Sequence, residues 1–355
     1  MKPNTNTSSQ RCQNDGFLAC LGYNPLMIPG NPKTDKPLFL APMEDVTDLP
    51  FRLVCKRLGA DVVVTEFTAA EALVRHIPKA LEKIRISPEE RPVGIQLFGS
   101  RPEAIQEAAA IAESLDPDFI DINCGCWVKN HVARAEGAGL LRDLSLFEKV
   151  VKAAVAGTRL PVTVKTRLGW DENSIVILEV ARMIEQCGAR MLTLHCRTRS
   201  QAHRGFAEWD WLEKVKKVIS IPLIGNGDVV SPQDVKAMFE TGCDGVMIGR
   251  GAISDPWLFA NSKHYLATGQ IPEAPSLKER VSVCLEHLAH VCKDHPGRRP
   301  VLAFRKHYTG YLKGLPGISR LRADLMQLED FESVRERLLR FIDESSSLSE
   351  GDVHA

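Results

Sequence analysis

The amino-acid sequence predicts an α/β fold, a (β/α)₈ (TIM) barrel, followed by a small C-terminal helical domain. Three features support this class of fold. After Lys36-Pro37, short apolar runs alternate with longer amphipathic stretches, the apolar runs number eight, and they stop near Ser276. Parallel strands joined by crossover helices produce this alternation, and eight such units close a barrel of roughly 250 residues. The 355 residues of the chain therefore accommodate the barrel and one further small domain.

Composition and pattern divide the chain into four segments. Residues 1–36 are rich in Asn, Ser, Thr, Pro and Gly, so we expect a poorly structured N-terminal extension. Residues 37–270 are the predicted barrel, and residues 276–343 are the predicted helical domain. The remaining residues, 344–355, form a polar tail that we expect to fray.

Each predicted strand is a short apolar run bounded by turn residues or polar residues. The expected strands are Leu38–Ala41, Val62–Glu66, Val93–Leu97, Phe119–Asn123, Val162–Arg167, Leu192–Cys196, Leu223–Asn226 and Gly245–Ile248. Ser100 with Glu103 resembles a capping box, and Ser231 precedes a proline at a first helical position, so both predict helix starts. Beyond the barrel, apolar periodicity predicts helices over Val281–His290, Val301–Lys313 and Phe331–Ile342.

The composition is that of a globular protein and excludes disordered and fibrous classes. Zero formal net charge argues against a histone-like binder of nucleic acid. The 10 cysteines include no Cys-x-x-Cys pair and favour a reducing compartment. We find no secretory signal and no apolar segment of ~20 residues, so we expect a cytoplasmic protein without membrane contact. No feature indicates an obligatory protein partner.

Polar residues end nearly every predicted strand, and in such barrels the functional residues lie at the C-terminal strand ends. We therefore expect one polar-lined pocket. Glycines after the last two strands, in Gly225–Asp228 and Gly249–Gly251, predict a phosphate site. Lys165 and His195 lie on neighbouring strands, where they suit the negative charge of a reduced flavin ring; an ion pair between Lys165 and Glu66 is the structural alternative.

Five motifs in order resemble the tRNA-dihydrouridine synthase family, most closely its bacterial B branch. They are Ala41-Pro42-Met43-Glu44-Asp45-Val46-Thr47-Asp48, Asp121-Ile122-Asn123-Cys124-Gly125-Cys126, Val164-Lys165-Thr166-Arg167-Leu168-Gly169-Trp170, Leu194-His195-Cys196-Arg197-Thr198-Arg199 and Asn226-Gly227-Asp228. The resemblance covers roughly residues 37–343. It implies an FMN site and active site in the barrel, NADPH as electron donor, tRNA bound by the helical domain, and reduction of the C5=C6 bond of uridine.

The resemblance also implies residue roles. Cys126 would be the general acid that protonates C5 while reduced FMN delivers hydride to C6; a thiol of ordinary pKa is mostly protonated at neutral pH. The implied flavin contacts are Pro42, Met43, Gln96, Lys165, His195, Asn226, Gly227, Asp228, Gly249 and Arg250. The implied substrate contacts are Asn123, Lys129, Arg167, Arg197 and Arg199, to which the helical domain adds Arg305 and Lys306.

Two positions beside Cys126 depart from the family pattern. The family has Pro where this chain has Trp127, and Val where it has His131. Because proline restricts the backbone, Trp127 implies a different loop geometry or an added aromatic surface for stacking. A metal site at Cys124, Cys126 and His131 matches no usual zinc spacing, so we expect no metal.

A basic run lies in the predicted helical domain. Residues 295–323 include no acidic residue and contain Arg298, Arg299, Arg305, Lys306, Lys313, Arg320 and Arg322. This run predicts a local positive field that suits RNA phosphates. Tyr308 and Tyr311 lie between Lys306 and Lys313, so we predict aromatic stacking as well; the alternative is a solvated basic helix with both tyrosines in the core.

Two other functions remain open on the sequence. One is a different FMN barrel oxidoreductase that acts on a free small molecule, which leaves the basic run unexplained. The other is a flavin-bearing RNA-binding factor without reductase activity, which Trp127 suggests.

Overall fold

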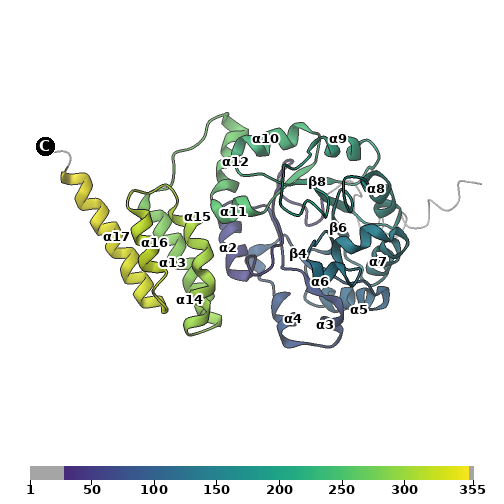
Figure 1. Ribbon diagram of the computed structural model, residues 1–355, viewed down its shortest axis with the longest axis horizontal. Helices are drawn as coiled ribbons and strands as arrows, with labels where there is room; N and C mark the ends of the chain where they lie inside the picture. The colour runs from purple at the N-terminus through teal and green to yellow at the C-terminus, as the bar shows by residue number, and fades with distance from the viewer. Residues whose placement is uncertain (1–27, 352–355) are drawn as a thin grey trace, which may run out of the picture.

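The computed structural model describes residues 28–351, which form a barrel with a helical domain beside it (Figure 1). The strands are β1 (Leu38–Leu40), β2 (Val62–Val64), β3 (Thr68–Ala69), β4 (Val93–Phe98), β5 (Phe119–Cys124), β6 (Val162–Arg167), β7 (Met191–His195), β8 (Leu223–Asn226) and β9 (Gly245–Ile248). All pairings are parallel, and β1 pairs with both β2 and β9 while β2 pairs with β4. Eight strands thus close into a barrel, which confirms the predicted fold class.

The eight predicted strands are all present, with ends within two residues of the prediction. The extra strand, β3, is two residues long and pairs with the end of β4. Its brevity explains why apolar patterning did not predict it, since a strand signal needs about four residues.

The interior of the barrel holds its own apolar cluster, which includes Phe39, Val62, Phe119 and Met247. Phe39 and Met247 are register partners on β1 and β9. Ile28 packs against the interior cluster, so the last part of the predicted extension is in contact with the barrel. Residues 1–27 of that extension lie outside the described residues.

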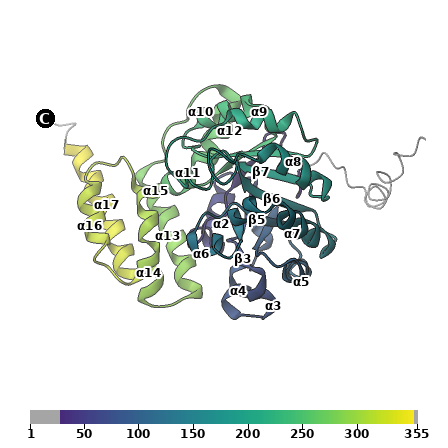
Figure 2. The ribbon, with the colours of Figure 1, turned by 45° about the vertical axis from the view of Figure 1, so that its right-hand side comes forward.

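Helices surround the barrel on its outside (Figure 2). They are α2 (Leu49–Arg57), α3 (Ala70–Val74), α4 (Pro78–Lys83), α5 (Pro102–Glu113), α6 (Lys129–Val132), α7 (Leu144–Ala156), α8 (Ile177–Gln186), α9 (Asp210–Lys216), α10 (Pro232–Glu240), α11 (Arg250–Ser254) and α12 (Leu258–Thr268). Ser231 caps α10 as predicted. The capping box at Ser100 is wrong, because Arg101 is the N-cap of α5 and Pro102 takes the first helical position that proline favours.

The helical domain consists of α13 (Leu277–Asp294), α14 (Arg298–Phe304), α15 (Tyr308–Leu312), α16 (Ile318–Leu325) and α17 (Phe331–Gly351). The single helix predicted over 301–313 is wrong, because a 3₁₀ turn at Arg305–His307 separates α14 from α15. Helix α16 was not predicted. Helix α17 continues to Gly351, so the first part of the tail is helical rather than frayed; extending an established helix costs little.

The helical domain packs against the side of the barrel that carries α2 and α11 (Figure 1). The ring of Phe51 in α2 lies 5.4 Å from that of His287 and 4.9 Å from that of His307. A Cβ on Gly310 of α15 would overlap the carbonyl oxygen of Ile253 in α11, so this close approach requires glycine. Because α11 begins directly after β9, the helical domain adjoins the C-terminal end of the barrel strands.

Within the part of the chain that the structure covers, no helix is both long enough and apolar enough to cross a membrane.

Candidate active site

A cavity of about 790 Å³ opens at the C-terminal ends of the barrel strands. Its volume falls within the 300–1,000 Å³ that is usual for ligand pockets. The cavity brings together twelve of the residues singled out in the sequence, which are Pro42, Met43, Asn123, Cys126, Lys165, Arg167, His195, Asn226, Gly227, Asp228, Gly249 and Arg250. The strand ends therefore meet at one polar-lined site.

The other six candidate residues do not line this cavity. They are Gln96, Lys129, Arg197, Arg199, Arg305 and Lys306. Lys129 is exposed on α6, and the Arg199 guanidinium lies 4.7 Å from the ring centroid of Trp170. The Arg305 guanidinium donates to the Leu328 carbonyl at 3.3 Å. Gln96 and Arg197 are buried, and each contacts a residue that lines the cavity: Gln96 contacts Asn123, and Arg197 contacts Asp228.

Hydrogen bonds hold the backbone around Cys126 in place. Asn123 Oδ1 accepts from the N–H groups of Gly125, at 3.0 Å, and Cys126, at 2.9 Å. Arg167 Nε donates to the Gly125 carbonyl at 2.9 Å. The Ala138 N–H donates to the Cys126 carbonyl at 2.9 Å, so Cys126 is fixed from both sides despite Trp127 beside it.

A buried network orients Asn123 in turn. Asn123 Nδ2 donates to Gln96 Oε1 at 2.9 Å, and Gln96 Nε2 donates to Asp121 Oδ2 at 2.6 Å. The Thr163 hydroxyl donates to the other oxygen of Asp121. Gln96 therefore reaches the site through Asn123 and does not line the cavity.

Cys126 is half-buried, and burial raises the pKa of its thiol above the ordinary value. The thiol is therefore protonated at neutral pH and can donate a proton. A nucleophilic or metal-binding cysteine needs the opposite shift, toward the thiolate. This environment suits a general acid.

Lys165 is a half-buried cation that faces the cavity. Burial, followed by the charge of Arg167, lowers the pKa of Lys165 to about 8. Its ammonium donates to Asn226 Oδ1 at 3.1 Å, and no carboxylate of the described residues lies within ion-pair distance of it. The alternative pairing with Glu66 is wrong, because Glu66 pairs with Lys83 at 3.3 Å.

His195 is neutral in this site. Burial, with the positive charges of Arg167 and Lys165, lowers the pKa of His195 well below its usual value. Arg197 Nη1 lies 3.4 Å from His195 Nε2. Since a guanidinium can only donate, Nε2 accepts and the proton lies on Nδ1.

Arg197 is buried and holds the loop after β7 through hydrogen bonds. It forms an ion pair with Asp228 at 2.5 Å and donates to the carbonyls of Arg204 and Gly205. Arg250, which is more than half exposed, approaches the other oxygen of Asp228 at 3.3 Å. The family resemblance did not predict that Arg197 is buried while Arg250 is exposed at the cavity.

Several lining residues were not predicted as contacts, including Glu44, Phe67 and His203. Glu44 lies inside the first of the five motifs, so the sequence could have indicated it as a site residue. His203 lies in the loop that follows the Arg197 and Arg199 motif, but a lone histidine in a loop carries no signal of its own. The edge-to-face contact between His203 and Trp127, with ring centroids 5.4 Å apart, depends on tertiary structure.

The basic run lies on the helical domain as an exposed surface. Arg298 pairs with Glu329 at 2.6 Å. The exposed cations of the run for which the described residues supply no acidic partner are Arg299, Lys306, Lys313, Arg320 and Arg322. The predicted stacking by Tyr308 and Tyr311 is wrong, because both are at most 1 % exposed in the core of the domain. The surface of the basic run therefore offers exposed cations, and its two tyrosines are not available for stacking.

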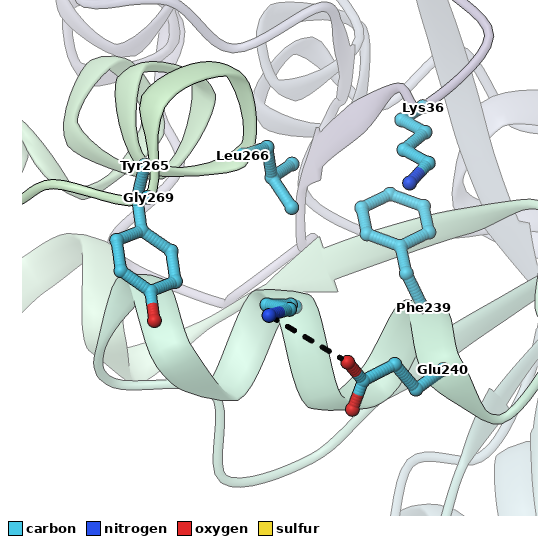
Figure 3. A pocket seen from close by; sticks show the side chains of 7 residues that line it. Lys36, Phe239, Glu240, Tyr265, Leu266 and Gly269 are labelled. Atoms are coloured by element: carbon cyan, nitrogen blue, oxygen red, sulfur yellow. Dashed lines mark ion pairs between the residues drawn. The ribbon is translucent and has the colours of Figure 1, made fainter.

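A smaller cavity, of about 230 Å³, lies between α10 and α12 on the outside of the barrel (Figure 3). Lys236 and Glu240 on its wall form an ion pair at 3.9 Å, and Lys36 lies over the ring of Phe239. This cavity shares no lining residue with the cavity at the C-terminal strand ends. Among the described residues, no group of three or more His, Cys, Asp or Glu side chains is placed to hold a metal ion.

Two sequence comparisons with known proteins agree on one family. The sequence profile described as dihydrouridine synthase (Dus) matches residues 39–346. "tRNA-dihydrouridine synthase B" of Pseudomonas aeruginosa is 39% identical over 298 residues, which cover 83% of this chain and 90% of that protein. "Probable tRNA-dihydrouridine synthase 1" of Synechocystis sp. is 39% identical over 302 residues, which cover 84% of each.

A solved structure resembles the fold. The 6-hydroxypseudooxynicotine amine oxidase of Pseudomonas geniculata N1 superposes with a TM-score of 0.52 at 16% identity. The match covers 76% of this chain and 56% of that chain. At such low identity, the likeness shows a shared barrel fold alone.

Proposed function

The chain belongs to the dihydrouridine synthase family, and we propose that it reduces the C5=C6 bond of uridine in tRNA, with FMN as cofactor and NADPH as electron donor. The observation that carries the proposal is the protonated thiol of Cys126 in a cavity that also holds the half-buried cation of Lys165. An acid beside an anion-stabilising group is what reduction of an enone-like double bond needs.

The cavity suits FMN on two grounds. Lys165 lacks a carboxylate partner among the described residues, so an electron-rich ring would supply the missing negative charge. The second ground is that Gly227, Gly249, Arg250 and Gly251 all line the cavity after β8 and β9, where glycine backbone and one cation suit a phosphate. Gly227, Gly249 and Arg250 would hold the phosphate, and Lys165, His195 and Asn226 would hold the ring.

Lys165, His195 and Asn226 would hold the ring of reduced FMN, which would supply the hydride for C6 of the uracil. Cys126 donates the proton that C5 needs, and its raised pKa keeps that proton available through neutral pH. Asn123 and Arg167 fix the Cys126 loop so that the thiol meets the substrate from one direction. Lys165 and His195, one cationic and one neutral, stabilise negative charge without competing for the proton.

The helical domain would bind the body of the tRNA. Its exposed cations lie on the domain that adjoins the open end of the barrel, and the Lys306 ammonium donates to the Asp45 carbonyl, close in sequence to the lining residue Glu44. Phosphates would therefore be bound beside the entrance to the site.

The proposal is tested with the full chain loaded with FMN. Purified protein, NADPH and unmodified tRNA should give dihydrouridine, which digestion and mass spectrometry detect. Free uridine and dihydroorotate replace tRNA in parallel reactions. Product from a free small molecule but not from tRNA would favour another barrel oxidoreductase; tight tRNA binding without any product would favour a binding factor.

A further inference from the structure

Phe206 is an exposed aromatic residue on a rigid loop. The exposed fraction of its side chain is 88%. The backbone on both sides of it is nevertheless held by hydrogen bonds to two charged side chains. Arg197 Nη2 donates to the Gly205 carbonyl at 2.7 Å, and the Ala207 N–H donates to Asp228 Oδ2 at 2.8 Å. Arg197 and Asp228 are themselves an ion pair, so one partly buried pair of charges presents Phe206 to solvent.

Single exposed apolar side chains are common, so Phe206 alone carries no conclusion. A second exposed aromatic residue, Trp127, lies on the loop after β5 and is 36% exposed. Its ring meets the edge of His203, which belongs to the same loop as Phe206. Trp127 and His203 both line the mouth of the cavity, so two separate loops contribute aromatic rings there.

The rings are uncharged and lie in a positive field. Partial burial, followed by the charges of Arg250 and Arg167, lowers the pKa of His203 to about 4, so its ring is neutral at physiological pH. Arg167, Arg197 and Arg250 thus lie near the neutral ring of His203, with Asp228 as the nearby negative charge. This combination suits a nucleic acid, whose bases stack on aromatic rings while its phosphates meet cations.

We propose that Trp127, His203 and Phe206, called here the aromatic rim, bind an unpaired base that neighbours the target uridine of the tRNA. This inference rests on the proposed function. The cavity admits the target base, so the adjoining nucleotides remain outside at its mouth. Trp127 and His203 line that part of the cavity, and Phe206 follows His203 by three residues on the same exposed loop. Every base has a π-face, so the rim gives affinity for single-stranded RNA without selecting a sequence.

The test compares variants of the rim in the FMN-loaded protein. Phe206→Ala, Phe206→Leu and Trp127→Ala should raise KM and Kd for tRNA by roughly 5- to 150-fold, the usual worth of one base stack. The Phe206 variants, which lie outside the cavity lining, should leave kcat little changed. Phe206→Tyr and Trp127→Phe keep a ring and should restore binding. The salt dependence of binding should stay unchanged, because these variants keep every cation that binds a phosphate.

Ile271→Ala is the matched control. Ile271 is 57% exposed between α12 and α13, so its removal should alter neither KM nor Kd. Thermal unfolding of each variant shows that it is folded. If Phe206→Leu binds tRNA like the wild type, the site recognises an apolar surface and not a stacked base, and the inference is overturned. Unchanged Kd in all rim variants would overturn it too. Absence of dihydrouridine with the wild type would instead count against the proposed function.

Discussion

The side-chain oxygen of Asn123 accepts a hydrogen bond from the backbone N–H of Cys126 at 2.9 Å, and this contact connects the barrel to the proposed proton donor. Asn123 is held by Gln96, which is held by Asp121, and each of these side chains comes from the barrel strands. Side chains of β4 and β5, together with Arg167 of β6, therefore hold the backbone of Cys126, and none of these contacts depends on the residue that follows it. This explains how the chain keeps the thiol in the cavity with Trp127 at the next position.

Replacing Asn123 should slow turnover through misplacement of Cys126. We expect Asn123→Ala to lower kcat by up to about 100-fold, the usual cost of misplacing a reacting group by an ångström. Flavin content, measured by absorbance, shows whether the cavity itself survives. An unchanged kcat would mean that Arg167 and Ala138 hold the loop without Asn123.

Removing the thiol should abolish most of the chemistry. Cys126→Ala should lower the rate of uridine reduction by ~10²–10⁴-fold, as loss of a general acid does. Cys292→Ala, in the helical domain, is the control and should react like the wild type. Near-normal turnover by Cys126→Ala would assign the proton to another group.

Affinity for FMN should depend on the charge of Lys165. The pKa of Lys165 is lowered to about 8, so its cation is present below that pH and lost above it. Raising the pH from 7 to 9 should weaken FMN binding to the apoprotein by up to about tenfold, because about a tenth of the lysine stays charged one unit above its pKa. Fluorescence titration measures Kd. Lys165→Met should bind weakly at both pH values; a wild-type Kd that does not change with pH would contradict the assignment.

The cations of the helical domain should contribute salt-dependent affinity. Lys306→Ala with Lys313→Ala should flatten the dependence of log affinity on log salt by ~0.7–0.9 for each phosphate that the variant no longer binds. Lys236→Ala, on the outside of the barrel, is the control with the same type of charge change. Equal slopes for the double variant and the wild type would show that this surface does not touch RNA.

The contact between the domains should tolerate no side chain at Gly310. A methyl group there overlaps the carbonyl of Ile253, so Gly310→Ala should lower the free energy of unfolding by about 1–3 kcal/mol through overpacking. Thr309→Ala, at the preceding residue, should change it much less. If both variants unfold at the same temperature, α15 does not pack this closely against α11.

Most of the fold could be predicted because each barrel strand is a short apolar run that ends in a polar residue. The helical domain was harder, since Arg305–His307 interrupts a pattern that is periodic on both sides. In the site, the residues at the strand ends could be predicted, because each one follows an apolar strand at its C-terminal end. The burial of Arg197 and the inward turn of Tyr308 and Tyr311 could not, because they depend on which side of a loop or helix packs against the core. Phe206 belongs to no motif, and its rigidity arises from contacts that span 31 residues between Arg197 and Asp228.

The central claim is that the barrel reduces uridine held within tRNA. The most direct test loads the protein with FMN, reduces it with NADPH without oxygen, removes the excess NADPH, and mixes it with unmodified tRNA. Stopped-flow absorbance follows flavin reoxidation, and mass spectrometry counts dihydrouridine in the quenched RNA. We predict reoxidation with one dihydrouridine formed for each flavin oxidised, and no comparable reoxidation by free uridine or dihydroorotate. Flavin that stays reduced with tRNA but is reoxidised by a free small molecule would contradict the account.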